Sequence, residues 1–237
     1  MKKTILNATL ILIFFAIATL ISLQFIAVLE FLVLQLSFGW VFGTIFIRLF
    51  VMIFFILGVL QFLLLLPKEK RLKDYWAILI GIGPGFLLSF ALFPIYNTDY
   101  GMLNDDLQIS NFEQLEADSY DSYQHVDEKK VLAFLDIGCG HCREACYKFT
   151  LIKEQNPDLP FYLFFYNDTV YVEDFVATYG DNQFSPYYLK SNESFINFAG
   201  FEFPSIYYVD ESSTSIYHWV GDELNYTAMD YLTGLKQ

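Results

Sequence analysis

The sequence predicts an α/β domain that follows an all-α membrane anchor of three transmembrane helices. One observation is the apolar segment 5–66, in which Glu30 and Arg48 are the only charged residues. Another is a pair of uninterrupted apolar segments, 131–135 and 161–165, separated by a helical pattern. Such segments are typical of strands covered on both faces. The predicted divisions are an anchor at 1–96, an acidic lead-in at 97–128 and the α/β domain at 129–237.

Charge is distributed unevenly along the chain. Residues 1–96 carry seven Lys and Arg against three Asp and Glu, a net charge of +4, whereas 97–237 carry seven against twenty-four, a net charge of −17. The 237 residues are 55% hydrophobic, which excludes an intrinsically disordered chain. The acidic second part also excludes nucleic acid as a partner, because binding nucleic acid requires a cationic surface.

The apolar segment is too long for one transmembrane helix, since a helix needs about 20 apolar residues to cross the hydrocarbon core. A turn is expected at 37–40, where Ser37 and Gly39 interrupt the pattern and Trp40 suits a membrane interface. A third hydrophobic segment contains Gly-Ile-Gly-Pro-Gly at 81–85, which should kink or break its helix. The predicted helices cover 5–35, 40–66 and 75–96.

The positive-inside rule sets the orientation of this anchor. Lys2 and Lys3 precede the first helix and four cations lie in the loop before the third, so both regions belong in the cytoplasm. Three crossings of the lipid bilayer then place 97–237 in the periplasm or outside the cell. A signal peptide cleaved after 16–18 is the alternative. It puts the domain on the same side, but the chain stays apolar to Leu36, which favours an uncleaved helix.

Glu30 and Arg48 are expected at similar depths, about 12–14 Å from the predicted turn at 1.5 Å per residue. Two isolated opposite charges at one depth predict an intramembrane ion pair, because each charge alone is costly in lipid. Such a pair is either a structural link between neighbouring helices or a proton or ligand site.

The second part alternates between strand and helix patterns. Within the lead-in, a strand is expected near 107–112. Gly180 and Gly200 are expected to end two of the helices, and Asp222 to cap the last one. The predicted strands are 131–135, 161–165, 205–209 and 215–220, the last two forming a hairpin, and the predicted helices are 139–155, 173–179, 193–199 and one from 222 to the C-terminus.

Two cysteines, Cys139 and Cys142, lie where the first buried strand gives way to a helix. Cys139 occupies the helix N-terminus, where unpaired amides and the macrodipole favour an anion, so its thiol is expected to ionise readily. Cys142 lies one turn deeper on the same face, close enough to form a disulfide. His141, between them, can place a positive charge near the thiolate and so make the disulfide a stronger oxidant.

Other uses of these residues are less well supported. A c-type haem site requires C-x-x-C-H, whereas Arg143 follows the second cysteine. Zinc could be bound by Cys139, His141, Cys142 and Cys146, but structural zinc sites draw their ligands from two separated pairs. A purely structural disulfide at this spacing closes almost no loop and stabilises little. We therefore expect redox chemistry with no metal and no cofactor.

The C-G-H-C sequence after a buried strand, together with Phe203-Pro204-Ser205 just before another strand, resembles the thioredoxin fold over about 125–237. The resemblance is to membrane-anchored extracytoplasmic thiol–disulfide oxidoreductases, and C-G-H-C is similar to the active site of protein disulfide isomerases. It implies a central mixed sheet flanked by helices, a redox-active Cys139–Cys142 disulfide and a cis-proline at Pro204. The residues that it implies in substrate binding are Phe203, Pro204, Ser205, Gly138 and Gly140.

The anchor faintly resembles the DoxX/MauE-type membrane regions that occur with such domains. That resemblance is carried by the stretch around Arg48, by 54–58 and by the third helix.

The sequence departs from the thioredoxin family at several positions. Many members carry a buried acid on the strand, six residues before the first cysteine, where this chain has Ala133. Asp136 is expected to point to the other face of that strand, so the group that moves protons to and from Cys142 stays open. Gly138 stands where a Trp is common. Phe203 is bulkier than the usual Thr or Val, and this narrows the expected substrate groove.

The remaining candidates are one cysteine and two histidines. Cys146 is expected to pack against the sheet as a small hydrophobe, with a third redox thiol as the alternative. A Cys142–Cys146 disulfide is disfavoured, because Cβ atoms four residues apart on a helix are about 5–6 Å apart and a disulfide requires about 3.5–4.5 Å. His125 and His218 are expected at the surface.

The predicted function is that of a membrane-anchored enzyme that exchanges disulfides with substrate proteins and with a further redox partner. The first 138 residues hold no cysteine, so the chain cannot relay electrons across a membrane through its own thiols. Two alternatives stay open. One is a dedicated reductase in cytochrome or metalloprotein maturation, and the other is a non-catalytic, membrane-tethered binding module with the same fold.

Overall fold

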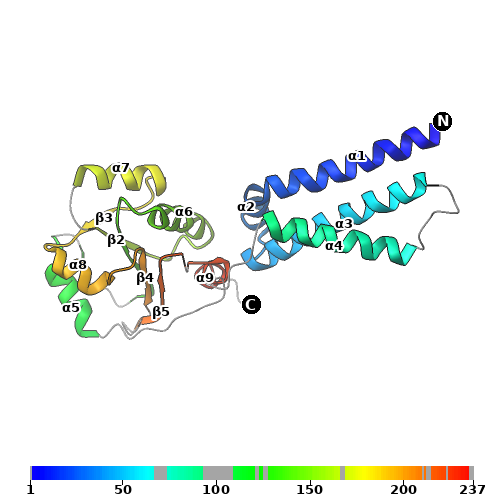
Figure 1. Ribbon diagram of the computed structural model, residues 1–237. Coiled ribbons are helices and arrows are strands. Elements are labelled where there is room, and N and C mark those ends of the chain that lie inside the picture. The colour runs from blue at the N-terminus through cyan, green and yellow to red at the C-terminus, as the bar shows by residue number, and fades with distance from the viewer. Residues whose placement is uncertain are drawn as a thin grey trace. The chain divides into compact units, whose positions relative to one another are not determined.

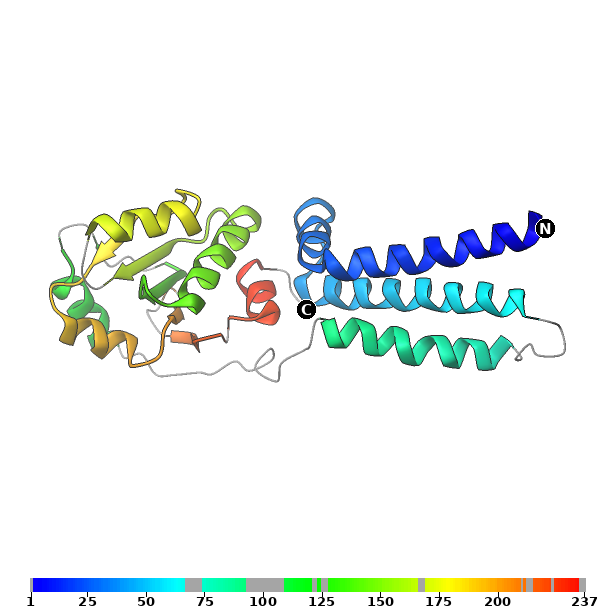
Figure 2. The ribbon, with the colours of Figure 1, turned by 45° about the horizontal axis from the view of Figure 1, so that its top comes forward.

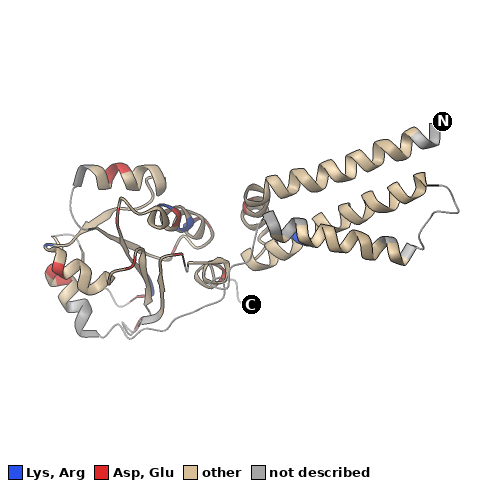
Figure 3. Ribbon diagram, in the orientation of Figure 1, with Lys and Arg blue, Asp and Glu red and all other residues tan. Residues whose placement is uncertain are grey.

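The computed structural model describes residues 2–66, 74–92, 109–120, 123–124, 128–165, 169–209, 211, 215–222 and 224–234. The chain divides into two compact units, Met1–Tyr96 and Asn97–Gln237. The described part of the first unit is helical, and that of the second contains a sheet with helices on both sides (Figure 1). Acidic and basic residues are sparse on the described helices of the first unit and numerous in the second (Figure 3).

The first unit contains four helices in its described part: α1 (Lys2–Leu23), α2 (Phe25–Leu36), α3 (Trp40–Leu65) and α4 (Asp74–Leu92). Helix α3 lies between α1 and α4 (Figure 2). The prediction of one helix over 5–35 is wrong, because the chain turns at Gln24 and starts a separate helix. The turn at 37–40 is confirmed: Ser37 adopts φ 56°, and Gly39 precedes α3 in an extended conformation. The predicted end of the third helix, 93–96, lies outside the described residues.

Two helices in the described part of the chain are long and apolar enough to cross a membrane, Ile5–Leu23 and Trp40–Leu65. Two of the three predicted transmembrane helices are therefore supported by length and composition within the described residues. The third predicted helix forms as α4, in which the described apolar stretch is Ile78–Leu87. A third crossing of the membrane stays a prediction.

The glycines of α4 allow close packing against α3. The helix runs without interruption through Pro84, so the break predicted as one possibility at 81–85 does not occur, and a kink there stays a prediction. A Cβ atom added to Gly81 would lie 2.9 Å from the Cα of Ile56, and one added to Gly85 would lie 3.2 Å from the Cα of Met52. Small residues four apart let two helix backbones approach closely, as they do in membrane helix pairs.

Arg48 of α3 is buried among aromatic rings. Its side chain is 8% exposed. Its guanidinium carbon lies 4.4 Å from the ring centroid of Phe90 in α4 and 5.4 Å from that of Phe25 in α2. The guanidinium thus links three helices through cation–π contacts. The predicted ion pair with Glu30 stays a prediction.

The second unit is built on a five-stranded mixed sheet, which confirms the predicted α/β class. The strands are β1 (Lys130–Leu135), β2 (Phe161–Phe165), β3 (Pro186–Tyr188), β4 (Ser205–Val209) and β5 (Ser215–Val220). Their order is β3-β2-β1-β4-β5. The first three are parallel, and β4 is antiparallel to both β1 and β5. The four strands with predicted bounds and the hairpin form at the expected residues, and β3 is a short edge strand.

Helices cover both faces of this sheet (Figures 1 and 2). They are α5 (Ile109–Asp118), α6 (Gly140–Gln155), α7 (Thr169–Tyr179), α8 (Asn192–Ala199) and α9 (Tyr226–Leu232). On one face, Phe134 of β1 stacks on Phe198 of α8, and Leu115 of α5 belongs to the same buried cluster. On the other, Phe149 of α6 packs on Phe161 of β2. The two faces of β1 therefore bury alternate residues, which explains its continuous apolar sequence.

Two local predictions in this unit are wrong. The strand expected near 107–112 is part of helix α5 over its described residues, because the segment buries Leu115 against the sheet from a helix. The last helix is capped by Asn225, whose side chain accepts from the N–H of Ala228, and not by Asp222. Other helix boundaries follow the sequence: Ser191 caps α8, and Gly200, at φ 72°, ends it.

Candidate active site

The end of β1 and the start of α6 position the two cysteines. All six residues of β1 are buried, and the chain then reaches the surface at Asp136 and Gly138. Cys139 precedes α6 in an extended conformation, and its sulfur accepts a hydrogen bond from the N–H of Cys142 at 3.4 Å. The N-terminal end of the helix therefore donates one amide to this sulfur, which favours negative charge on it.

A segment 64 residues away in sequence meets Cys139. The Cys139 thiol is half-buried and lies 3.4 Å from the carbonyl oxygen of Phe203, to which it donates. The Phe203–Pro204 peptide bond is cis, as expected from the resemblance. The ring of Phe203 stacks on Phe195 of α8 with centroids 5.6 Å apart. We call residues 203–205 the proline strap.

Cys142 lies beneath the surface. It is 0% exposed, and its sulfur accepts a hydrogen bond from the backbone N–H of Asp136 at 3.3 Å. Burial raises the pKa of the Cys142 thiol far above its ordinary value, the N–H of Asp136 partly offsets this, and the neighbouring Cys139 raises it further. The carboxylate of Asp136 is exposed and accepts from the N–H of Gly138 at 2.7 Å. Asp136 thus approaches Cys142 through its backbone.

Cys146 lies in the core, as expected for a small hydrophobe. It is 0% exposed, and burial raises its pKa to about 12. A Cβ atom added to Gly180, at the end of α7, would lie 3.3 Å from its sulfur. The third thiol is therefore held between α6 and the end of α7, and it is protonated at neutral pH.

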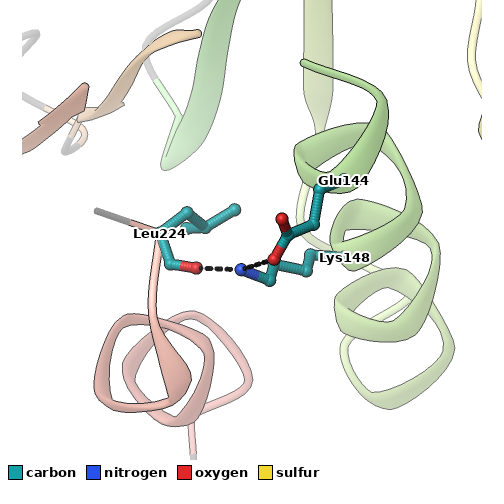
Figure 4. A network of polar contacts seen from close by, with 3 residues as sticks. All are labelled: Glu144, Lys148 and Leu224. Atoms are coloured by element: carbon teal, nitrogen blue, oxygen red, sulfur yellow. Dashed lines mark hydrogen bonds and ion pairs between the residues drawn. The ribbon is translucent and has the colours of Figure 1, made fainter. Parts of the chain in front are cut away.

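His141 is exposed on the first turn of α6. The shallow hollow beside it is lined by His141, Glu144, Ala145, Lys148, Gly221, Asp222 and Leu224. Lys148 crosses this hollow: its Nζ donates to the carbonyl oxygen of Leu224 at 2.8 Å and lies 2.7 Å from Oε1 of Glu144 (Figure 4). Lys148 therefore ties α6 to the segment between β5 and α9. In the sequence, the four-residue spacing of Glu144 and Lys148 indicates their ion pair, but nothing local indicates the contact with Leu224.

The hairpin β4–β5 holds the proline strap from the other side. The carbonyl oxygen of Pro204 accepts from the N–H of Gly221 at 2.9 Å. Ser205 is 0% exposed, and its hydroxyl lies 2.9 Å from Nε2 of His218. The side chain of Ser205 therefore points inward and is not available to a partner.

Sequence reasoning missed His218, which was expected at the surface. It is half-buried, and its ring is parallel to that of Tyr207, with centroids 4.0 Å apart. Residues 207 and 218 are direct partners across the hairpin, so residue 205 is a diagonal neighbour of 218 on the same face. Counting the register of the predicted hairpin would have found this pair. His125 lies outside the described residues.

The described residues gather no three His, Cys, Asp or Glu side chains in an arrangement that could hold a metal ion. Of the four ligands considered for zinc, Cys142 and Cys146 are buried, whereas His141 is exposed. The predicted glycines are exposed: Gly138 precedes Cys139, and Gly140 begins α6.

Comparison with known proteins gives a likeness in structure alone. No family model matches the chain, and no curated protein matches its sequence. Among solved structures it is similar to a secreted Mycobacterium tuberculosis disulfide oxidoreductase homologous to E. coli DsbE, at 18% identity and a TM-score of 0.38, covering 46% of this chain and 80% of that one. MTB DsbF gives 18% identity, a TM-score of 0.40 and coverage of 46% and 81%. A candidate thiol:disulfide interchange protein DsbE from Chlorobium tepidum gives 15% identity and a TM-score of 0.38, covering 46% of this chain and 81% of that one.

Proposed function

We propose that the chain is a membrane-anchored thiol–disulfide oxidoreductase of the thioredoxin-like class. One observation carries the proposal. A half-exposed Cys139 thiol at a helix N-terminus lies 3.4 Å from the carbonyl oxygen of Phe203 in a cis-proline segment, with a second thiol, Cys142, buried one turn deeper. This arrangement offers one thiol to a partner and keeps the other for an internal reaction.

The reaction has two balanced steps. The Cys139 thiolate attacks a partner disulfide, one partner sulfur leaves as a thiolate that takes up a proton, and a mixed disulfide forms. Cys142 then loses its proton and attacks the Cys139 sulfur, which releases the second partner thiolate and closes the Cys139–Cys142 disulfide. Two electrons pass to the partner, and the reverse sequence oxidises a partner dithiol. The first amides of α6 stabilise charge on Cys139 in both directions.

The substrate contacts belong to the same proposal. A partner segment lies along Phe203 and Pro204, and the exposed glycines Gly138 and Gly140 leave room for it beside Cys139. Phe201, two residues before Phe203, is 87% exposed and adds an apolar contact. His141, exposed on the first turn, adds positive charge near the thiolate when it is protonated. No cofactor takes part in this reaction.

Location completes the proposal. Helices α1 and α3 cross the bilayer, and α4 crosses it a third time, so the N-terminus is cytoplasmic and 97–237 faces the periplasm or the cell exterior. Lys2 and Lys3 at the start of α1 and the basic residues in the loop before α4 support this orientation. The electrons come from or go to a separate redox partner, since residues 1–138 hold no cysteine.

The reduction potential tests the function and its direction. The full-length chain in detergent is equilibrated in glutathione buffers, alkylated and weighed by mass spectrometry, with Cys146→Ala as the control that removes the third thiol. A potential of about −180 mV or higher indicates an oxidase or isomerase, and about −270 mV or lower indicates a dedicated reductase, as in cytochrome or metalloprotein maturation. The absence of any reversible couple would refute the enzyme and leave a binding module.

A further inference from the structure

Three consecutive residues of the proline strap are each held by a different residue outside the strap. The carbonyl oxygen of Phe203 accepts from the Cys139 thiol at the start of α6. The carbonyl oxygen of Pro204 accepts from the N–H of Gly221, just after β5. The hydroxyl of Ser205 meets Nε2 of His218 within β5. The strap is therefore fixed between the redox helix and the last strand.

The contact between Ser205 and His218 joins a buried hydroxyl to a half-buried imidazole. Because Ser205 is 0% exposed, its hydroxyl needs a partner inside the protein, and Nε2 of His218 lies 2.9 Å away. The direction of that nitrogen is set by the imidazole ring, which lies 5° from parallel with Tyr207 at 4.0 Å. Tyr207 is itself fixed, since its hydroxyl donates to the carbonyl oxygen of Phe198 in α8 at 3.0 Å.

We propose that Ser205 and His218 are positioning residues for disulfide exchange. Their hydrogen bond sets the place of the strap, and thereby the rate at which a peptide partner lying along Phe203 and Pro204 brings its disulfide to Cys139. Ser205 follows Pro204 directly, and Pro204 follows Phe203. A shift of Ser205 therefore also moves the carbonyl oxygen of Phe203, which the Cys139 thiol contacts. Displacements of about 1 Å at a reacting centre can lower rates strongly. The inference rests on the proposed function.

A positioning role and a purely structural role predict effects on different substrates. A peptide disulfide uses the strap, because its backbone lies along it. A small aromatic disulfide such as 5,5′-dithiobis(2-nitrobenzoate) reacts with Cys139 from solvent and needs no strap. The ratio of the two second-order rate constants therefore reports the position of the strap and is insensitive to the amount of active protein.

The experiment compares four single variants and the Ser205→Ala/His218→Phe double variant of the full-length chain in detergent. Ser205→Ala removes the hydroxyl, and His218→Phe keeps a ring stacked on Tyr207 but removes the nitrogen. His218→Gln keeps a hydrogen-bonding group. The matched control is Ser119→Ala, which removes another buried hydroxyl, 4% exposed and bonded to the carbonyl oxygen of Leu115. Exchange is measured with a peptide disulfide and with the aromatic disulfide.

We expect Ser205→Ala and His218→Phe each to lower the peptide rate about fivefold, the size expected for one buried hydrogen bond. The aromatic disulfide should react at the wild-type rate, the double variant should be no slower than either single variant, and His218→Gln should recover most of the loss. Equal losses with both disulfides, losses that add in the double variant, or unchanged rates would each overturn the inference. A wild-type chain that exchanges with neither disulfide would refute the proposed function, and the inference with it.

Discussion

Cys139 and Cys142 differ in exposure, and this separates their roles in exchange. Cys139 is half-buried beside the proline strap, whereas Cys142 is 0% exposed. In Cys142→Ser the first step still occurs and the second cannot, so partners should accumulate as mixed disulfides on Cys139. Non-reducing gels followed by mass spectrometry detect these adducts. Cys139→Ser is the control and should trap none; adducts that persist in it would contradict the assignment.

Burial of Cys146 should make the free energy of unfolding fall as pH rises above 9. Burial raises its pKa from the ordinary 9.0 to about 12, so the folded state keeps a proton that the unfolded state loses. Its contribution is complete below pH 9 and is lost as pH rises toward 12. Cys146→Ala should therefore lose stability less steeply above pH 9, by up to about 1.4 kcal/mol per pH unit.

Urea unfolding followed by the fluorescence of Trp219, the only Trp after residue 96, measures this difference. Cys142 and Tyr162, whose pKa values burial also raises, shift stability with the same sign in both proteins. Their contributions therefore cancel in the difference between the wild type and Cys146→Ala. Parallel pH profiles for the wild type and Cys146→Ala would show that Cys146 ionises normally.

At the scale of elements, Lys148 joins α6 to the segment before α9. Its side chain is 18% exposed and donates to the carbonyl oxygen of Leu224. Lys148→Met keeps the aliphatic stem and removes the bond, and we expect it to lower the free energy of unfolding by about 1–2 kcal/mol. Glu144→Gln is the control, because an exposed ion pair contributes at most about 0.5 kcal/mol. Urea titrations measure the free energy of unfolding of both variants. Equal losses would show that the hydrogen bond to Leu224 does not contribute to stability.

The same scale shows what the sequence could predict. Strand β1 is apolar from Val131 onward, and β2 consists of Phe, Tyr and Leu, so their positions followed from burial on both faces. The helix from Cys139 followed from its apolar stripe. The break at Gln24 was not predictable, because α1 and α2 are both apolar and no Gly or Pro marks the change.

Elements of mixed polarity were missed for another reason. Helix α5 is acidic, and Leu115 is the one fully buried residue within its described side chains, 114–118, so these residues show no clear period. In the candidate site, the cysteines and Pro204 came from local motifs. The role of His218 follows from the register of the predicted hairpin, whereas those of Gly221 and Lys148 depend on loop packing, which local sequence does not encode.

For the whole molecule, the orientation in the membrane can be tested with the native cysteines. Residues 1–138 hold none, Cys142 and Cys146 are buried, and Cys139 is half-buried. A membrane-impermeant maleimide should therefore label Cys139 in intact, mildly reduced cells that express the chain, if 97–237 faces outward. Cys139→Ser should remove the label. Labelling that appears only after the membrane is permeabilised would reverse the proposed topology.

Ala133 has a consequence for the lifetime of the complex with a partner. It is 0% exposed on β1 and supplies no carboxylate there to receive the proton of Cys142, whose pKa burial raises. Resolution of the mixed disulfide then waits on a small thiolate fraction, which grows about tenfold for each pH unit. In the proposed exchange reaction, the covalent complex with a partner therefore lasts longer in a more acidic compartment and is shorter-lived in a more alkaline one.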